Sequence, residues 1–423
     1  MKNFLHKLQI ITKEKALWSR ILFVLGIFVA FRLLSAIPVP GISTFELQQF
    51  LNSNQFFGFL NLFSGGGLSQ LSLVMLGVGP YITASVIMQL LTIMSPKLKS
   101  MYQEEGEIGR KKFNRYSRFL TVPIALIQGA SLLTVLAKQG VIVAPSMIMI
   151  AFYALMVMAG SFLAVWLGEL ISEYGIGNGV SVIIFAGIVA SIPAQLNQLV
   201  FLYDPSQLLT YIAVIILALV VITAVVLVTE AERPVPVTYS KQARGGNVYG
   251  GTSSYIPLRI NQAGVMPIIF AVSILMLPQF VAQLLANSAN ATALAISNGI
   301  SWFLNNGWLY AAVYFVFVFV FTFFYTAITF DPQAMSNNLH KGGAFIPGVR
   351  PGTATEEYLG KIVTRTTFFG AFFLATIAVL PIILQTITGI QALAIGGTGI
   401  LIVVSVLIDI MKKLDAQISM REY

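Results

Sequence analysis

The chain has 423 residues, of which 57% are hydrophobic and only 10% are charged. A soluble protein usually carries about 25% charged residues, so this composition excludes an ordinary soluble domain and indicates a polytopic membrane protein. The absence of cysteine excludes a disulfide framework, a thiolate metal site and a cysteine nucleophile. The net charge of +9 suits either nucleic acid or anionic lipid, and the positions of the charges must distinguish these partners.

Ten stretches of mostly apolar residues have the length of about 20 residues that a transmembrane helix needs. In chain order they are residues 19–37, 73–94, 119–137, 146–167, 180–199, 208–229, 263–285, 308–330, 368–387 and 392–411. The fifth is interrupted by Gly187 and Pro193. The first run is long and no small-residue cleavage site follows it, so we do not expect a removable signal peptide.

The basic residues predict the orientation of these spans. If both termini lie inside, the inside segments hold 22 of the 25 Lys and Arg residues. An excess of basic residues on one side marks the cytoplasmic face, so we predict cytoplasmic termini. The inside segments are residues 1–18, 95–118, 168–179, 230–262, 331–367 and 412–423.

Two of these inside segments, 230–262 and 331–367, are large and rich in Gly and Pro. In the second, Arg350 lies between Gly348 and Pro351, at a predicted turn. The segments are either solvated loops that only set orientation, or docking arms for an anionic partner such as ribosomal RNA or an acidic protein surface.

The chain lacks the residue patterns of common active sites. His6 and His340 lie far apart without ligand-spaced partners, and there is no nucleophile elbow or phosphate-binding loop. We therefore predict no catalytic residue, no metal site and no cofactor.

Ionisable residues within the spans are the usual mark of a transporter, because each costs about 2.5–3.5 kcal/mol at mid-depth. Here they are few. Arg32 lies toward the outer end of the first span, Glu169 at the inner edge of the fourth, and Asp409 one turn before Lys412 and Lys413. A secondary transporter of small solutes needs polar groups that converge at the midplane. It remains the alternative function.

The stretch 61–93 is long and uncharged, yet it is broken by the triplet Gly65-Gly66-Gly67 and again by Gly79 and Pro80. Non-helical backbone at membrane depth is tolerated only where protein or a water-filled cavity satisfies it. We therefore expect this stretch to line a cavity. A similar Gly-before-Pro start recurs five spans later, at residues 264–267, and hints at a repeated half.

A set of motifs carries a family resemblance. They are FSGG at 63–66, GPYI at 79–82, EEGEIGRKK at 104–112, GELISEYGIGNG at 168–179, NQAGVMP at 261–267 and GGAFIPGVRPG at 342–352. Over nearly its full length the chain resembles the SecY family, whose members form the pore of the protein translocase.

The resemblance implies an all-α fold of ten transmembrane helices in two pseudo-symmetric five-helix halves around an hourglass pore. The halves would be residues 1–200 and 201–423, with the large cytoplasmic loops at about 230–262 and 331–367. A short re-entrant helix, at about 57–73, would plug the pore from outside. Its central residues would be Phe63, Ser64, Gly65, Gly66, Gly67 and Leu68.

The resemblance also implies roles for single residues. The aliphatic pore ring would be Val78, Ile82, Ile184, Ile269 and Ile402. The polar contacts of the lateral gate, between spans two and three and spans seven and eight, would be Thr83, Gln89 and Asn261. The contacts with a ribosome or the SecA motor would be Lys241, Arg244 and Arg350.

The function implied is that of a protein-conducting channel, not an enzyme, in the bacterial cytoplasmic membrane. It would pass unfolded preproteins across the membrane and release transmembrane segments into the lipid. The implied partners are SecE-like and SecG-like small subunits, SecA, the ribosome, signal sequences, nascent chains and anionic lipids. A membrane-protein insertase without a sealed pore would differ from such a channel by lacking a plug.

Overall fold

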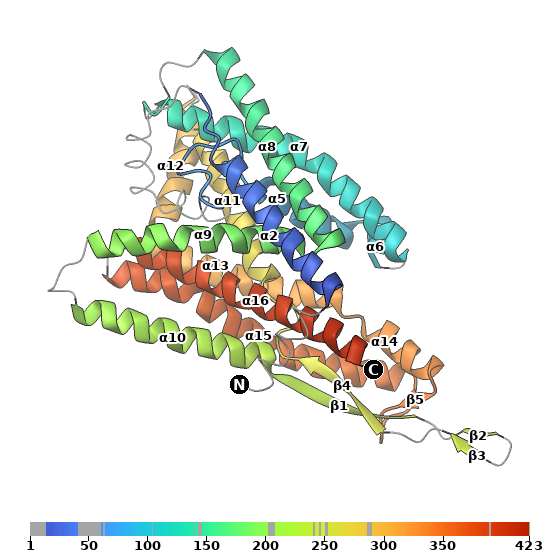
Figure 1. Cartoon of the computed structure of the whole chain (residues 1–423). Coiled ribbons are helices and arrows are strands. Elements are labelled where there is room, and N and C mark those ends of the chain that lie inside the picture. Colours follow the sequence, from blue (N-terminus) through green and yellow to red (C-terminus); the bar gives the residue numbers. More distant parts are fainter. Residues whose placement is uncertain are drawn as a thin grey trace.

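The computed structural model describes residues 14–40, 61, 64–103, 105–138, 140–142, 146–201, 208–239, 242–244, 247–249, 253–285, 290–388 and 391–422. Over these ranges the chain is largely a bundle of helices, with a small sheet at one end (Figure 1). The helices are α2 (Lys15–Ser35), α5 (Gly79–Met94), α6 (Pro96–Gln103), α7 (Gly106–Lys138), α8 (Met147–Tyr174), α9 (Gly179–Phe201), α10 (Leu208–Glu230), α11 (Met266–Leu285), α12 (Ala291–Asn305), α13 (Gly307–Thr329), α14 (Pro332–Lys341), α15 (Thr353–Thr388) and α16 (Gln391–Glu422).

Each of the ten predicted spans overlaps one of these helices. Six described helices are long and apolar enough to cross a membrane, and the helical parts of α5, α9, α10 and α12 that meet the apolar criterion are shorter. The chain is thus a multi-pass membrane protein, while the total of ten spans stays a prediction. Several helices extend well beyond their apolar stretch; α7 and α15 each begin more than ten residues earlier, in segments predicted to lie inside.

The second predicted span is shorter than expected, because α5 begins at Gly79 and not at residue 73. The preceding residues form turns, with Gly77 at a φ of 54°, a conformation that glycine adopts without steric cost. Pro80 lies in the first turn of α5, where its missing N–H has no partner to lose.

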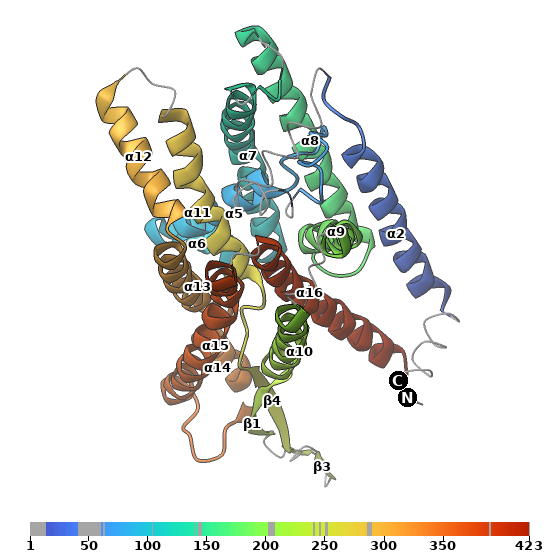
Figure 2. The same ribbon diagram turned by 90° about the vertical axis from the view of Figure 1, so that its left-hand side faces the viewer.

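Helix packing follows the two predicted halves and joins them at two places. Within the first half, α2 packs on α8, α5 on α7, α7 on α8 and α8 on α9; within the second, α10 packs on α16, and α13 on both α11 and α15. The halves meet where α5 and α7 pack on α11, and where α9 packs on α16. Figure 2 shows α7, α5 and α11 side by side.

Each predicted half has an ion pair that joins two of its own helices. Arg118 Nε lies 2.7 Å from Glu169 Oε1 and connects α7 with α8. Lys412 Nζ lies 2.9 Å from Glu230 Oε1 and 3.3 Å from the Thr229 carbonyl oxygen, and so connects α16 with α10. Partly exposed pairs of this kind contribute at most about 1 kcal/mol each, but they favour one relative position of the paired helices.

A small antiparallel sheet, formed mainly in the segment between α10 and α11, adds to the expected all-α fold. Strands β1 (Glu232–Tyr239) and β4 (Ser253–Arg259) pair, and β5 (Ala344–Phe345) pairs with the end of β1; β2 (Gln242–Arg244) and β3 (Asn247–Tyr249) form a separate hairpin. Because β5 reaches only Thr238 and Tyr239, β1 is an edge strand at Pro234 and Pro236, where proline is tolerated.

This sheet has its own apolar core, separate from the membrane-spanning bundle. Val235 and Val237 alternate with exposed residues along β1 and are buried against Leu359 and Ile362 of α15. The two large inside segments of the sequence are therefore one folded unit, which a reading of each segment alone does not reveal.

Helix α12 is also absent from the sequence-based prediction, which treated residues 286–307 as an outside loop. Asn290 caps its N-terminus, with the Asn290 Oδ1 atom accepting a hydrogen bond from the Thr292 N–H at 3.1 Å. Ser297 anchors it to α11 by donating to the Ala282 carbonyl at 2.8 Å. The helix is apolar, as its neighbours are, but too short to be counted as a span.

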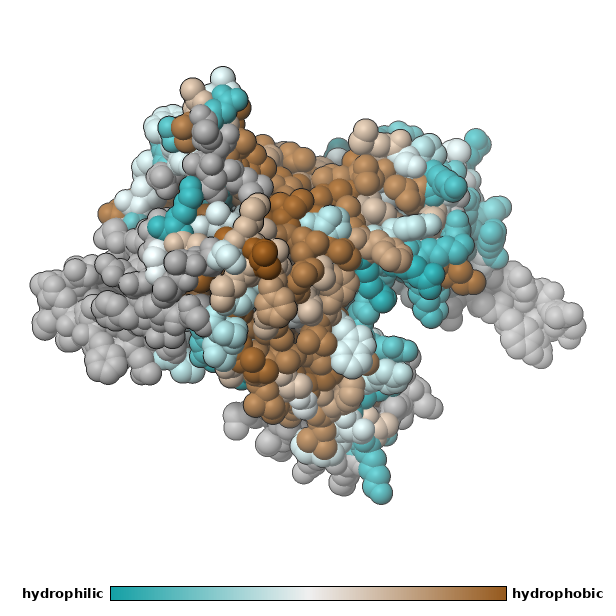
Figure 3. All heavy atoms as spheres, turned by 90° about the horizontal axis from the view of Figure 1, so that it is seen from above, coloured by the Kyte–Doolittle hydropathy of each residue, from teal (hydrophilic) through white to brown (hydrophobic). Residues whose placement is uncertain are grey.

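The surface of the bundle is apolar over a broad band. Large hydrophobic side chains are exposed along α2, α8 and α10, for example Val29, Trp166 and Leu219. Figure 3 shows one view in which hydrophobic residues cover the middle of the molecule and hydrophilic residues lie toward its edges. Such a band is what a lipid-facing surface requires.

Two glycines offer a matched test of helix packing. A Cβ added at Gly160 of α8 would collide with the carbonyl oxygen of Leu73, whereas one added at Gly26 of α2 would meet nothing within 4 Å. We expect Gly160→Ala to lower stability by about 1–3 kcal/mol through overpacking. We expect Gly26→Ala to be neutral or stabilising by up to about 1 kcal/mol. Thermal unfolding midpoints in detergent measure both, and equal midpoints would contradict the packing described.

Candidate pore constriction and plug

The five residues of the predicted ring come from four helices and both predicted halves. Val78 is the N-cap residue of α5 and Ile82 lies in its first turn, while the others lie on α9, α11 and α16. All five side chains are at most 5% exposed and belong to one continuous hydrophobic cluster. They are Val78, Ile82, Ile184, Ile269 and Ile402.

The interior around these residues is uncharged. Among the residues whose side chains the structure describes, no Asp, Glu, Lys or Arg is buried. Over the same ranges, no group of His, Cys, Asp or Glu could hold a metal ion. The buried polar side chains are Ser, Thr, Gln and Asn, many of which donate to a carbonyl of their own helix. The polar groups described at this centre are therefore neutral hydroxyls and amides.

Among the described residues of the predicted plug, residue 61 is helical and residues 64–71 form turns. Residues 57–60 and 62 and Phe63 lie outside the described residues. We call residues 64–71 the plug loop. The Ser64 Oγ atom accepts a hydrogen bond from the Leu68 N–H at 3.1 Å, and Ser69 Oγ donates to the Gly66 carbonyl at 2.7 Å. Gly65 and Gly66, with φ angles of 68° and 82°, allow the tight turn.

Asn61, the described residue that comes before the plug loop in the chain, accepts two further hydrogen bonds from it. Its Oδ1 atom accepts from the Ser69 N–H at 2.9 Å, and its carbonyl accepts from the Gly66 N–H at 2.8 Å. The loop therefore satisfies much of its own backbone, as non-helical chain inside a membrane protein must.

The far end of the plug loop is fixed to the residues that follow α2. Pro38 and Ser72 form an isolated antiparallel bridge, in which the Val39 N–H donates to the Leu71 carbonyl at 2.9 Å and the Leu73 N–H to the Ile37 carbonyl at 3.0 Å. Leu71 is fully buried and has a φ of 42°, which is unusual for a residue other than glycine.

The plug loop also touches two helices of the first predicted half. A Cβ at Gly65 would lie 2.7 Å from Phe31 Cε1 of α2 and 3.0 Å from the Gly187 Cα of α9, so only glycine allows this approach. Leu68, with no exposed surface, lies in the same cluster as all five ring residues.

The three predicted gate residues are buried, and their hydrogen bonds are local. Thr83 Oγ1 donates to the Gly79 carbonyl at 3.1 Å, one turn earlier in α5. Asn261 holds the turn before α11, with its side chain bonded to the N–H and carbonyl of Gly264 at 3.0 and 3.3 Å. Gln89 Nε2 reaches Ser85 Oγ at 3.5 Å, and its Oε1 atom is buried without a hydrogen-bond partner.

Two of the three predicted cytoplasmic contacts, Arg350 and Arg244, are among the described residues. Arg350 is exposed in a turn bounded by Gly348 and Gly352, whose φ angles are 83° and 102°. The turn is held by Thr355 Oγ1, which donates to the Arg350 carbonyl at 2.9 Å, and by Ser336 Oγ, which donates to the Gly352 carbonyl at 2.7 Å. Arg244 ends β2, and Lys241 lies outside the described residues.

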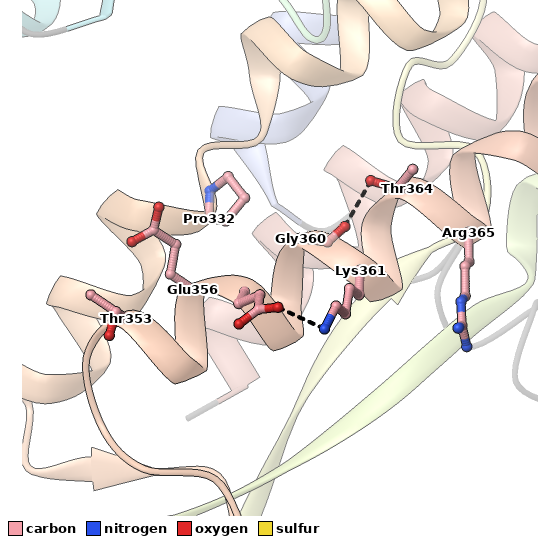
Figure 4. A pocket seen from close by; sticks show the side chains of 8 residues that line it. Pro332, Thr353, Glu356, Gly360, Lys361, Thr364 and Arg365 are labelled. Atoms are coloured by element: carbon pink, nitrogen blue, oxygen red, sulfur yellow. Dashed lines mark hydrogen bonds and ion pairs between the residues drawn. The ribbon is translucent and has the colours of Figure 1, made fainter.

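Beside this turn an open groove of about 680 Å³ runs along the first turns of α15, opposite the start of α14 (Figure 4). Its lining carries both signs of charge, including the Glu357–Lys361 ion pair at 2.7 Å. An open groove of mixed charge is unlike the enclosed, mainly apolar pocket of a small-molecule site. The lining residues are Pro332, Thr353, Glu356, Glu357, Gly360, Lys361, Thr364 and Arg365.

Sequence reasoning missed the residues that hold the plug loop in place. Asn61 and Leu71 give no pattern by which a sequence identifies them. Arg32 was noted only as a charge in the first span, yet its Nη1 atom donates to the Gly65 carbonyl at 3.0 Å. An isolated cation in an apolar helix was the signal for such a contact.

The fold and the site together define a class of protein: a polytopic helical membrane protein with an apolar centre, in which no charged side chain is buried among those described. The family is established by sequence. The SecY family model matches residues 72–411, and the chain belongs to the SecY family.

Curated relatives match almost from end to end. The protein translocase subunit SecY of Thermotoga maritima is 40% identical over 97% of this chain and 95% of its own length. The SecY subunit of Halalkalibacterium halodurans is 40% identical, over 96% of this chain and 95% of its own length. The SecY subunit of Mycobacterium bovis is 37% identical, also over 96% of this chain and 95% of its own length.

Solved structures confirm the fold. A protein-conducting channel is similar with a TM-score of 0.62, at 19% identity, over 93% of this chain and 91% of its own. A SecY protein whose plug domain stabilises its closed channel is similar with a TM-score of 0.64, at 20% identity, over 93% of this chain and 91% of its own. Sec61 in the canine ribosome–channel complex gives 0.57, at 18% identity, again over 93% and 91%.

The buried, unpaired Gln89 Oε1 atom leads to a prediction. A buried acceptor without a partner costs about 1–3 kcal/mol, so Gln89→Leu should stabilise the protein and raise its thermal unfolding midpoint in detergent. Thr83→Val serves as the comparison, because it removes a hydroxyl that is bonded and should not raise the midpoint. A lower midpoint for Gln89→Leu would contradict the unpaired state of the Gln89 Oε1 atom.

Proposed function

We propose that the chain is the pore-forming subunit of a bacterial protein translocase. It passes unfolded preproteins across the cytoplasmic membrane and releases transmembrane segments sideways into the lipid. The observation that carries the proposal is the buried, uncharged cluster to which both predicted halves contribute Val78, Ile82, Ile184, Ile269 and Ile402. Family membership and the similarity to channel structures support the same function.

The closed state would be sealed in two ways. A ring of aliphatic side chains excludes water and ions, because a narrow apolar constriction dewets. The plug loop blocks the path beside the ring, with Leu68 buried in the same cluster. A ring of flexible aliphatic side chains without charge can then fit around an extended polypeptide of any sequence.

The gate to the lipid would lie where α5 and α7 pack on α11, which is one of the two junctions between the predicted halves. Its buried polar residues Thr83, Gln89 and Asn261 bond locally, so separating the helices there breaks few directed contacts. A signal sequence that binds between the helices would stabilise the open state by replacing the apolar contacts that are lost.

Movement would be driven from outside the chain, by a ribosome or by the SecA ATPase, since we assign no catalytic residue to the chain itself. We propose the exposed turn around Arg350 as a contact, together with Arg244 and Lys241 of the neighbouring hairpin segment. A charged, exposed and locally rigid turn suits an anionic surface. The remaining partners are SecE-like and SecG-like subunits, signal sequences and nascent chains, with anionic lipids along the basic cytoplasmic face.

A secondary transporter of small solutes is not favoured. It needs polar or charged groups that converge at the midplane, and no charged side chain is buried among those described. An insertase without a plug would have no use for the buried loop at residues 64–71.

The seal is tested by polar substitution in the ring. Ile82→Asn and Ile402→Asn place an amide in the buried cluster. They should weaken the closed state by roughly 1–3 kcal/mol, which corresponds to about a tenfold rise in resting ion conductance per 1.4 kcal/mol. The measurement is the conductance of the purified protein in planar bilayers without substrate.

Volume-conserving variants serve as controls. Ile82→Leu and Ile402→Leu keep the apolar volume and should leave the resting conductance unchanged. Deletion of residues 65–71 should raise conductance in a channel and have no effect in an insertase. Unchanged conductance in both asparagine variants and in the deletion would rule out a sealed pore.

A further inference from the structure

The turns of the plug loop are closed by hydrogen bonds within or next to the loop. Its position in the bundle is determined by other contacts. Its turns are closed by Ser64, Ser69 and Asn61, all of them within or next to the loop. Nothing in these bonds decides where the loop lies relative to the helices. That position must come from contacts with other elements.

One end of the loop is fixed by backbone alone. The bridge between Pro38 and Ser72 ties the exit of the loop to the segment after α2. A loop held at one end can still swing about that point. The position of its other end, around Gly65, therefore depends on what contacts it there.

Gly65 packs against Phe31 and Gly187 there, and the polar contact at this end comes from Arg32. It lies in the last turn of α2, and its Nη1 atom donates to the Gly65 carbonyl at 3.0 Å. A Cβ at Gly66 would lie only 3.5 Å from the same nitrogen, so the guanidinium lies against two successive residues of the turn. Among the hydrogen bonds of the described residues, two side chains outside residues 64–71 bond to the plug loop: Asn61, which precedes it in the chain, and Arg32, which comes from α2.

The bond also explains why an arginine occurs at this position. A cation within the membrane is costly, so a guanidinium in an apolar helix is expected to have a polar partner. At the C-terminal turn of a helix a cation is favoured by the helix dipole, but this alone requires no contact with the loop. A bond from an ionised donor is stronger than one between neutral groups, and the acceptor here is a carbonyl that the bonds of the plug loop itself do not use.

We propose that Arg32 is a latch that holds the plug loop in its closed position, and that opening of the channel breaks the bond from Arg32 to the Gly65 carbonyl. The proposal rests on residues 64–71 acting as the plug. Arg32 is a positioning residue: it touches the plug and not the translocating chain. Loss of the latch should leave the loop folded but shift it toward the open position.

The test uses the complete chain, purified with its partner subunits and reconstituted. Arg32→Gln removes the cation and shortens the donor, and Arg20→Gln, near the other end of α2, is the matched control for charge loss in the same helix. Arg32→Gln should raise the resting conductance in planar bilayers about tenfold, the effect expected from losing a charge-assisted hydrogen bond. Arg20→Gln should leave it unchanged.

A second readout follows the loop itself. Because the chain has no cysteine, Leu68→Cys introduces a single thiol at a position with no exposed surface. In the otherwise unchanged chain, a membrane-impermeant maleimide should label it slowly. With Arg32→Gln present, labelling should be about tenfold faster, while Arg20→Gln should leave the rate unchanged. A change in pore width alone, without displacement of the loop, would not produce this pattern.

The outcomes separate the latch from the proposed function. If deletion of residues 65–71 raises conductance and Arg32→Gln changes neither conductance nor labelling, the latch is wrong and the plug stands. If the deletion itself has no effect, the plug assignment fails. Should Arg32→Gln not assemble, Arg32→Lys keeps the cation but loses the planar donor group, and it must give faster labelling than the native chain for the latch to hold.

Discussion

The constraint on which the rest of the structure depends is the need to satisfy non-helical backbone inside an apolar bundle. Residues 64–78 contain no regular helix, yet Leu68, Leu71 and most of residues 74–78 have no exposed surface. Unpaired backbone groups at such a place would be costly. The chain meets this cost locally, with serine and asparagine side chains, a two-residue bridge and a series of turns. The start of α5, and with it Val78 and Ile82, is positioned by the end of this segment.

A second property follows from where the directed contacts lie. Two ion pairs between helices, Arg118–Glu169 and Lys412–Glu230, each join residues of the same predicted half. The junctions between halves, at α5–α11 and α9–α16, are packed with apolar side chains from one shared cluster. Apolar contact has no preferred direction, so such surfaces can separate and rejoin without loss of specific bonds, whereas each half keeps its own arrangement.

Much of the fold could be predicted because it depends on local composition. Runs of about 20 apolar residues located the helices that overlap the ten spans, and the one-sided distribution of Lys and Arg gave a definite orientation to test. The sheet was missed because β1 is stabilised by β4 and by β5, more than 100 residues later in the chain. The start of α5 was placed six residues too early because hydropathy does not distinguish a buried turn from a buried helix.

The candidate site shows the same limit. The ring residues were identified by family resemblance, since an isoleucine in an apolar helix has no distinguishing pattern of its own. The contact between Arg32 and Gly65 joins residues 33 positions apart and depends on backbone geometry at a glycine with positive φ. Only a structure can reveal it. The unexpected α12 arises from an N-cap, Asn290, within a segment too polar at its ends to resemble a span.

The junction between α10 and the sheet has a mechanical consequence. A single residue, Ala231, separates the last residue of α10 from the first of β1, and the Ala231 N–H still bonds to the Leu227 carbonyl at 2.9 Å. A strand of eight residues spans about 26 Å, and β1 is joined to α10 over a one-residue connection. Helix α10 in turn packs on α16, the helix that carries Ile402. The position of the sheet is thus coupled, through two packed helices, to the apolar centre of the bundle.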